Sequence, residues 1–118
     1  MILINVKDFS EFPGPRREVV GPNSGEKFRE TVLLPTINSN PDALIVINLD
    51  GTAGYGSSFL EESFGGLIRH GIPLKRVQEI CDNIISLEDD SLIEEIRDYV
   101  AEAQEQLALD NKERALEK

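Results

Sequence analysis

The most constraining feature of this sequence is an apolar run at residues 43–49, Ala-Leu-Ile-Val-Ile-Asn-Leu. The run is short, rich in β-branched residues and almost free of polar ones. Such a run is typical of a strand that is buried on both faces in a sheet flanked by helices. A loop rich in glycine and serine follows at residues 51–57. The sequence therefore predicts a strand that leads into a tight turn, as in the first half of a βαβ unit.

The segment after this loop predicts a helix over residues 58–70. Its apolar residues fall on one stripe at helical spacing, namely Phe59, Leu60, Phe64, Leu67 and Ile68. Ser58 precedes Glu61 by three residues, which is the spacing of a capping box. We therefore expect Ser58 to be the N-cap, with Glu61 reaching back to it, and the helix to stop before Gly71 and Pro73.

The junction between the predicted strand and helix reads Asn48-Leu49, then Thr52 to Gly56, then Ser57-Ser58-Phe59-Leu60. This order resembles STAS domains, the fold of anti-sigma-factor antagonists, in which an Asp/Asn-Leu pair ends a strand and an Asp-Ser-Ser-Gly-Leu turn opens a helix. More specifically, it resembles the bacterial STAS-like family of unknown function, whose Ser-Phe-x-(Asp/Glu)-Glu signature matches residues 58–62. Gly56 stands where the STAS motif has its aspartate, and Phe59 stands where it has its glycine.

The resemblance implies a small α/β STAS-like domain with a mostly parallel core sheet of about four strands and about three main helices. The expected order is strand, short strand, helix, strand, helix, strand, helix. We assign the strands to residues 2–6, 18–20, 43–49 and 83–88. A short helical piece is expected at residues 73–81, between the second main helix and the last strand.

The first main helix is expected to begin after a cap at Asn23 or Ser24. Its buried stripe consists of Phe28, Val32, Leu33 and Ile37. Pro35 lies inside this pattern. Because proline lacks an amide hydrogen and clashes with the preceding turn, we expect it to kink the helix or to end it near Leu34.

The last helix is expected to begin after a cap at Ser91 or Asp89. Its apolar face consists of Leu92, Ile93, Ile96, Tyr99, Val100, Ala103 and Leu107. Residues 110–118 are highly charged and are expected to fray.

The composition indicates a single domain over residues 1–118. The chain has 12 basic and 22 acidic residues and a formal charge of −10. This charge disfavours binding to nucleic acid or to an anionic membrane and favours a partner with a basic face. One cysteine, Cys81, excludes an internal disulfide and fits a reducing compartment. No stretch has the length of a membrane span or of a signal h-region, so we expect a cytoplasmic protein.

The residues give little support to catalysis, to a cofactor or to a metal site. Residues 51–58 approach a phosphate-binding loop, but Ser57 stands where that motif needs its lysine. The single histidine, His70, lies about 18 Å along the predicted helix from Ser58, which is too far for a Ser–His pair. Cys81 is expected in the core, and a zinc site would need more cysteine and histidine than the chain has.

Arg16 and Arg17 follow Pro15 in a chain that has few basic residues. They could hold an anion or a partner carboxylate. An ordinary exposed position is the alternative interpretation.

Ser57 and Ser58 are the candidate phosphoacceptors. By the resemblance, Ser57 corresponds to the first serine of the family's pair, the one that is phosphorylated in anti-sigma antagonists. The resemblance implies a non-enzymatic interaction module in a bacterial regulatory circuit, with a protein partner such as a histidine-kinase-like ATPase or an anti-sigma-type protein. The expected docking residues are Arg16, Gly54, Tyr55, Gly56, Ser57, Phe59, Glu61 and Glu62.

Two other classes of function remain open. One is a nucleotide-binding, phosphate-binding or enzymatic subunit that uses the loop from Gly51 to Ser58. The other is a structural subunit that forms a homodimer through apolar surface left by the short sheet.

Overall fold

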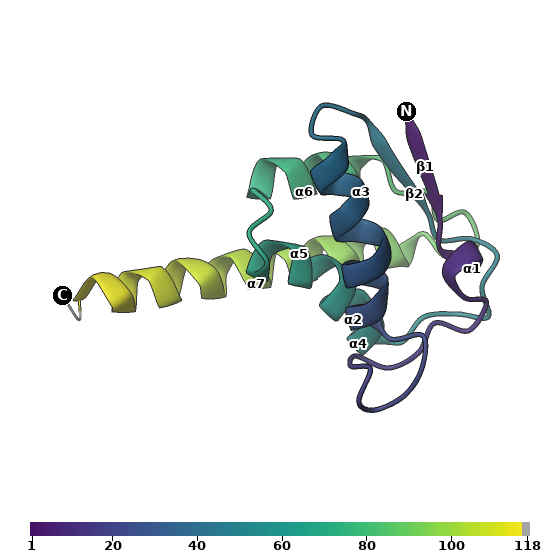
Figure 1. Cartoon of the computed structure of the whole chain (residues 1–118), viewed down its shortest axis with the longest axis horizontal. Helices are drawn as coiled ribbons and strands as arrows, with labels where there is room; N and C mark the ends of the chain where they lie inside the picture. The colour runs from purple at the N-terminus through teal and green to yellow at the C-terminus, as the bar shows by residue number, and fades with distance from the viewer. Residues whose placement is uncertain (117–118) are drawn as a thin grey trace.

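The fold contains a sheet of two short parallel strands (Figure 1). In the computed structural model, which describes residues 1–116, β1 (Ile2–Asn5) pairs with β2 (Ile45–Asn48). The register runs from Ile2 opposite Ile45 to Asn5 opposite Asn48. The three apolar residues of β2 are buried, as expected for a strand covered on both faces. The strands predicted at residues 2–6 and 43–49 are therefore confirmed.

A helical crossover joins the two strands. After α1 (Val6–Phe9) and an irregular loop, the segments α2 (Gly25–Phe28), η1 (Arg29–Leu33) and α3 (Leu34–Ser39) run on as one helix, here called the crossover helix. Its N-cap is Ser24, whose hydroxyl accepts a hydrogen bond from the Lys27 amide at 3.0 Å. Asn23, the other predicted cap, adopts a left-handed conformation with φ of 58°.

Pro35 does not end the crossover helix, which continues to Ser39. The expected disturbance takes the form of a π turn, because η1 ends directly before Leu34 and the Leu34 amide donates to the carbonyl of Arg29. Single π turns of this kind occur inside helices where the regular hydrogen-bond ladder is interrupted. The prediction of an end near Leu34 is therefore wrong, although a distortion lies there.

The segments α4 (Ser57–Leu60), η2 (Glu61–Gly65) and α5 (Gly66–Arg69) form a second continuous helix, here called the central helix. It begins one residue earlier than predicted, and its N-cap is Gly56, which makes no side-chain capping bond. The predicted capping box of Ser58 and Glu61 is therefore wrong. The physical reason is that the Glu61 carboxylate is bound by two arginines, Arg16 and Arg69, and does not reach back to the helix start.

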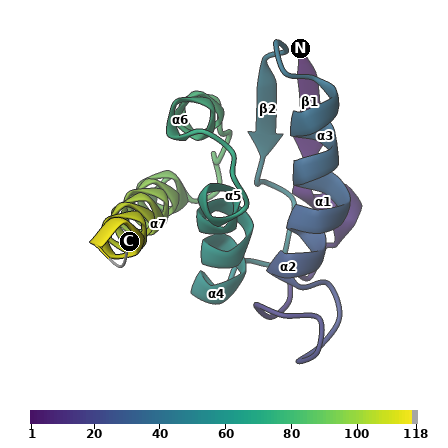
Figure 2. The same cartoon turned by 60° about the vertical axis from the view of Figure 1, so that its left-hand side comes forward.

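The central helix lies in the middle of the fold and is packed on two sides (Figure 2). It lies between α7 on one side and the crossover helix with β2 on the other, and it contacts both helices. Every residue from Phe59 to Ile68 except Glu61 is buried. Aromatic rings join the crossover helix to it, since the Phe28 ring lies 5.8 Å from that of Phe59 and 5.1 Å from that of Phe9.

Two of the four predicted strands are wrong. Residues 18–20 form a turn, and Val19 and Val20 are 92% and 73% exposed, so nothing pairs with this β-branched pair. Of the strand predicted at 83–88, only a single parallel bridge between Ile85 and Asn48 forms. The strand does not continue because the Asp50 carboxylate accepts hydrogen bonds from the amides of Leu87 and Glu88.

Residues 1–116 thus contain two strands and five helices, if each π segment is counted with the α segments around it, and not four strands and three helices. The two remaining helices are α6 (Leu74–Asp82) and α7 (Ser91–Leu116). The first confirms the helical piece expected at 73–81. No helix of residues 1–116 combines the length and the apolar character that a membrane crossing needs.

The start of α7 is held by Asp89, whose carboxylate accepts from the Ser91 amide at 3.1 Å and from the Ser91 hydroxyl. The helix continues to Leu116, so residues 110–116, which the sequence predicts to fray, are helical in the structure. Residues 117 and 118, which the same prediction covers, lie outside the described part of the chain.

Candidate functional site

The loop between β2 and the central helix lies at the carboxyl end of the parallel strands, the edge where open α/β sheets form their binding sites. Its base is tied to the segment that precedes α7. The Asp50 carboxylate accepts from the amides of Leu87 and Glu88 at 3.1 and 3.0 Å. In return, the Glu88 carboxylate accepts from the Gly51 amide at 3.0 Å. These reciprocal bonds fix where the loop leaves the sheet.

Tyr55 closes the loop from the inside. Its hydroxyl donates to the Leu49 carbonyl at 2.6 Å, and its ring lies 6.0 Å from that of Phe59. Burial raises the pKa of Tyr55 to about 12, so the hydroxyl keeps its proton and remains a donor at neutral pH. A further bond joins the Ala53 amide to the Glu11 carbonyl at 2.7 Å. The loop is therefore anchored to three separate parts of the chain.

The tip of the loop, by contrast, points into open space. Gly54, Gly56, Ser57 and Ser58 are exposed. A β-carbon added at Gly54 or Gly56 would meet no atom within 4 Å. Gly54 has a φ of 134°, a conformation that favours glycine, whereas Gly56 is extended with a φ of −81°. Four of the predicted site residues thus share one exposed surface.

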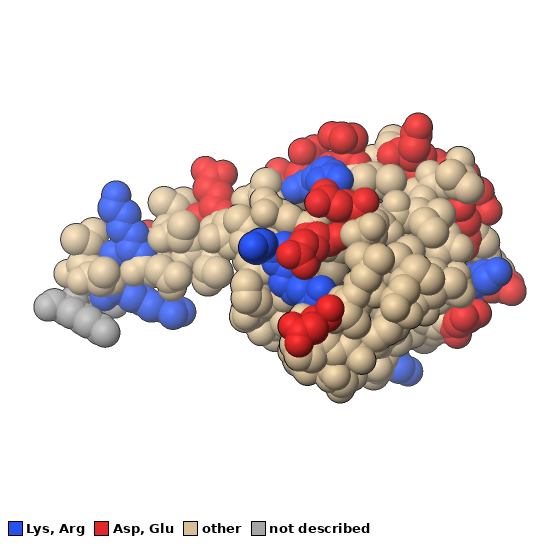
Figure 3. Space-filling model, turned by 90° about the horizontal axis from the view of Figure 1, so that it is seen from above, with Lys and Arg blue, Asp and Glu red and all other residues tan. Residues whose placement is uncertain are grey.

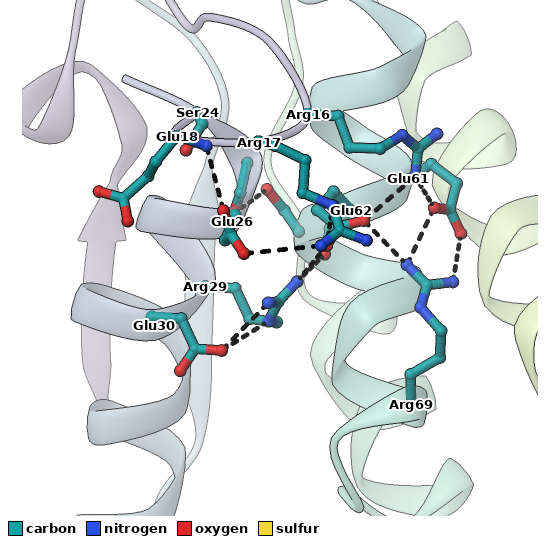
Figure 4. Close-up of polar contacts among 12 residues, drawn as sticks. Arg16, Arg17, Glu18, Ser24, Glu26, Arg29, Glu30, Glu61, Glu62 and Arg69 are labelled. Atoms are coloured by element: carbon teal, nitrogen blue, oxygen red, sulfur yellow. Dashed lines mark hydrogen bonds and ion pairs between the residues drawn. The ribbon is translucent and has the colours of Figure 1, made fainter. Parts of the chain in front are cut away.

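Two other predicted docking residues, Phe59 and Glu62, are 1% and 4% exposed. Phe59 belongs to the aromatic core. Glu62 faces Arg29, a buried residue of the crossover helix, whose Nη1 lies 2.9 Å from the Glu62 carboxylate and 2.9 Å from its carbonyl oxygen (Figure 4). The side chains of Phe59 and Glu62 therefore make their contacts within the interior of this chain.

Glu61 is bound from two sides. Arg69 donates to its carboxylate at 2.7 and 2.9 Å, and Arg16 donates to it from the irregular loop. Arg16 also donates to Glu62 at 3.1 Å. Burial raises the pKa of Glu61 and of Glu62, but hydrogen bonds from the arginines outweigh it, so that the pKa of each carboxyl stays below its usual value. The bond to Glu61 likewise raises the pKa of Arg16 and Arg69.

We call these five residues the arginine–glutamate cluster: Arg16, Arg29, Glu61, Glu62 and Arg69. The cluster joins the irregular loop, the crossover helix and the central helix (Figure 4). Arg17 lies at its edge, 3.8 Å from Glu26 and 3.9 Å from Glu62. Arg16 thus binds carboxylates, as one sequence interpretation held, but they belong to its own chain.

Sequence reasoning missed Arg29, although the sequence contains a signal for it. Gly65 and Gly66 form a pair in the middle of a helix, where each glycine costs about 1 kcal/mol relative to alanine. A β-carbon at Gly66 would lie 2.6 Å from the Arg29 Nη1 atom, and one at Gly65 would meet the Glu61 carboxylate. The glycine pair therefore makes room for the arginine–glutamate cluster.

A hollow of about 230 Å³ lies beside the loop. It is lined by Asp50, Tyr55 and Leu92, and also by Glu88 and Asp89. The three carboxylates give it a negative potential, which disfavours a phosphate group. Nowhere in residues 1–116 do three or more His, Cys, Asp or Glu side chains come together in a way that could hold a metal ion.

The remaining sequence candidates lie apart from the loop. His70 is exposed directly after the central helix, at the end opposite to Ser58. Cys81 is buried in the core, as predicted, and burial raises its pKa to about 11.

The parallel strands, the anchored loop and the helix that opens with a serine pair define a STAS-like α/β domain. In a comparison with family models, residues 24–89 match the family described as the STAS-like domain of unknown function (DUF4325), and the chain belongs to that family. No curated protein and no solved structure gave a significant match. The matched region includes the crossover helix, the loop and the central helix, while β1 and α7 lie outside it.

Proposed function

We propose that this chain is a non-enzymatic protein-interaction module of a regulatory circuit. Its partner docks on the loop at residues 51–57 and on the first turn of the central helix. The observation that carries the proposal is the contrast between the anchored base of this loop and its exposed tip. Loops held by a rigid scaffold are where proteins of this type place their binding residues.

The proposed docking surface consists of Gly54, Tyr55, Gly56, Ser57 and Ser58. Tyr55 is half-buried and contributes its outer edge, while the other four are exposed. Because the chain carries a net charge of −10, a partner with a basic face would be favoured both in encounter rate and in specificity. A histidine-kinase-like ATPase or an anti-sigma-type protein is the partner class that membership of a STAS-like family favours.

Phosphorylation of Ser57 is the proposed switch. Ser57 is the first residue of the central helix. There, amides without helical partners can donate hydrogen bonds to a phosphate, which carries roughly 1.5 to 2 negative charges. Ser57 also lies near Tyr99 of α7, whose hydroxyl donates to the Glu95 carboxylate at 2.6 Å. A phosphate on Ser57 would therefore approach the Glu95 carboxylate and make the docking surface more negative.

The same geometry argues against a nucleotide-binding or enzymatic subunit. The loop lacks the lysine that would meet the phosphates. The adjoining hollow is lined by Asp50, Glu88 and Asp89, which would repel an anion. The expected result of a calorimetric titration with Mg-ATP is no binding in the micromolar range, and a micromolar affinity would favour the enzymatic alternative.

To test the switch, the partner is first captured from cell extract with the full chain as bait and then titrated with purified variants. Ser57→Asp should weaken partner binding tenfold or more, about 1.4 kcal/mol, while Ser57→Ala should bind like the wild type. Ser39→Asp is the matched control, because Ser39 is exposed at the end of α3, before β2 and therefore away from the loop. It adds the same charge and should leave the affinity unchanged.

Two results together would contradict the switch. One is equal affinity of wild type, Ser57→Ala and Ser57→Asp for the partner. The other is the absence of any phosphopeptide that covers Ser57 after incubation with the partner and ATP. The serine pair would then serve only to open the helix.

A further inference from the structure

The C-terminal part of α7 projects beyond the body of the molecule (Figure 1). The helix has 26 residues and is about 39 Å long. Beyond Leu107 its side chains are almost all exposed, including Leu109 at 50% and Leu116 at 78%. Most of the stability of a helix in a protein comes from tertiary packing, and the intrinsic helix propensity of its residues adds little. This part of α7 therefore has a face that no other element within residues 1–116 covers.

The same chain carries a groove that could receive such a helix. A cavity of about 360 Å³ lies between α6 and α7. Its apolar lining is formed by Leu74, Cys81, Val100 and Ala101, and Arg97 and Glu105 lie at it as well. The groove leads toward the projecting part of α7, because Ala101 and Glu105, which line it, lie on the same helix directly before that part.

One face of α7 has a regular repeat, here called the alanine seam: Ala101, Glu105, Ala108, Lys112 and Ala115. Its members are spaced alternately by four and three residues, the repeat that keeps one helix facing another over its length. All five are exposed, and Leu109 and Leu116 flank them. Small alanine side chains allow two helices to approach closely, while the leucines at the side supply apolar area.

From this geometry we infer that two copies of the chain associate through antiparallel α7 helices that meet along the alanine seam. A two-fold axis between residues 108 and 109 sets Ala108 of each copy opposite Leu109 of the other. In the same register Glu105 opposes Lys112, and Ala101 opposes Leu116. The exposed Leu116 of one copy is thereby brought to the groove of the other, since Ala101 lines that groove.

Charge complementarity favours this arrangement. Glu105 and Lys112 lie seven residues apart, about 10.5 Å along one helix, and neither forms an ion pair within residues 1–116. The positions three and four residues from Lys112 hold Ala108, Leu109, Ala115 and Leu116, none of which is charged. In the antiparallel pair, however, each Lys112 meets a Glu105, and two-fold symmetry makes this contact twice.

The overall charge of −10 opposes association of two copies. The projecting part of α7 is the exception, since residues 107–116 contain two acidic residues, Asp110 and Glu113, and two basic residues, Lys112 and Arg114, which sum to zero. Figure 3 shows side chains of both signs on this projecting end as well as on the body. The projecting ends therefore add no net repulsion, whereas Glu102 and Glu105 bring the whole contact region at residues 101–116 to a net charge of −2, which the contacts between Glu105 and Lys112 partly offset.

The first test measures the mass of the full chain by sedimentation equilibrium from about 1 μM to about 1 mM, the range of weak association. We expect a concentration-dependent dimer, and Leu109→Glu with Leu116→Glu should raise its dissociation constant tenfold or more. Leu87→Glu is the matched control, because Leu87 is 88% exposed outside α7, and it should leave the constant unchanged. A chain that stays monomeric throughout would overturn the proposal and would indicate that α7 binds a different protein. A dimer that is indifferent to the two leucines would overturn it too.

The second test distinguishes this register from any other. Glu105→Lys and Lys112→Glu should each weaken the dimer, because each sets like charges opposite each other, and the double variant should return to the wild-type constant. A double variant as weak as the single ones would contradict the antiparallel pairing.

Cross-linking checks the same register without relying on affinity. Under mild oxidation Ala108→Cys should form a disulfide between copies, whereas Gln106→Cys, which lies off the alanine seam, should not. The native Cys81 does not interfere, since it is buried and its pKa is raised to about 11. Equal cross-linking of the two variants, or none at position 108, would overturn the proposal.

Discussion

Arg29 and Glu62 lie 33 residues apart in the sequence, and their side chains meet at 2.9 Å with exposures of only 3% and 6%. Arg29 also donates to the Glu30 carboxylate at 3.0 Å and to the Glu62 carbonyl at 2.9 Å. No buried side-chain nitrogen or oxygen in residues 1–116 lacks a hydrogen-bond partner. A buried ion pair that is satisfied in this way is costly to break from one side, because the remaining charge is left without a partner.

The first prediction follows from that pair. Glu62→Gln should lower the free energy of unfolding by about 3 kcal/mol, because it leaves the buried Arg29 guanidinium with only the half-exposed Glu30 carboxylate as a counter-charge. Asp82→Asn makes the same chemical change in the exposed pair of Asp82 and Arg97 and should cost less than about 1 kcal/mol. Urea unfolding of the three proteins, followed by circular dichroism, measures both effects.

The double variant Arg29→Met with Glu62→Leu provides the control for this prediction. It removes both charges, so it should be clearly more stable than Glu62→Gln alone. If the double variant were the least stable of the set, shape and packing at the cluster would matter more than its charges.

The second prediction concerns pH. The folded-state pKa of Glu61 and of Glu62 is lower than the usual value, so each carboxylate contributes stability that is present above the unfolded-state pKa of about 4.3. This stability is lost as the pH falls through the lower folded-state pKa. Urea melts should therefore give a nearly constant contribution between about pH 7 and 5.5 and a decline below about pH 4.5.

The variant Glu61→Gln with Glu62→Gln identifies the source of that decline. It lacks both carboxylates, so its stability should fall less steeply with acid than that of the wild type. The same steepness in both proteins would assign the acid sensitivity to other carboxylates of this acidic chain.

The third prediction concerns Gly66. In an open helix Gly→Ala stabilises by about 1 kcal/mol, but here the new β-carbon would lie 2.6 Å from the Arg29 guanidinium, which two glutamates hold in place. Gly66→Ala should therefore destabilise the chain in urea melts. In an Arg29→Met background the cost should shrink, because the atom that it meets is gone. An equal cost in both backgrounds would mean that the backbone, and not Arg29, requires glycine there.

The parts of the fold that the sequence predicts well are those with a local pattern. The apolar run of β2 and the stripe of Phe59, Phe64 and Ile68 depend only on period and composition, and both elements form. The pairing of Arg29 with Glu62 depends on how two helices cross, which no local pattern contains. The strand predicted at residues 83–88 does not form for a similar reason, since the Asp50 carboxylate, 37 residues earlier, accepts a hydrogen bond from the Leu87 amide.

At the proposed docking surface the sequence predicted the loop before the central helix but named the wrong cap. Serine at the position three residues before a glutamate satisfies the capping-box pattern, yet Glu61 has stronger partners in Arg16 and Arg69. Charge-assisted bonds of this kind are roughly twice as strong as neutral ones. The competition between them could be foreseen only with the arginines in place.

The last prediction tests this corrected helix start. Because Gly56 is the N-cap and makes no side-chain bond, Ser58→Ala should change the stability by no more than a few tenths of a kcal/mol, and not by the roughly 1 kcal/mol of a lost cap.

Gly56→Asp restores the residue that the STAS motif has at this position. Its carboxylate can accept from the first amides of the central helix, and a β-carbon there meets nothing within 4 Å. It should therefore leave the stability unchanged or raise it by up to about 1 kcal/mol. Urea melts of both variants decide the point: a loss near 1 kcal/mol for Ser58→Ala, with no gain from Gly56→Asp, would return the cap to Ser58.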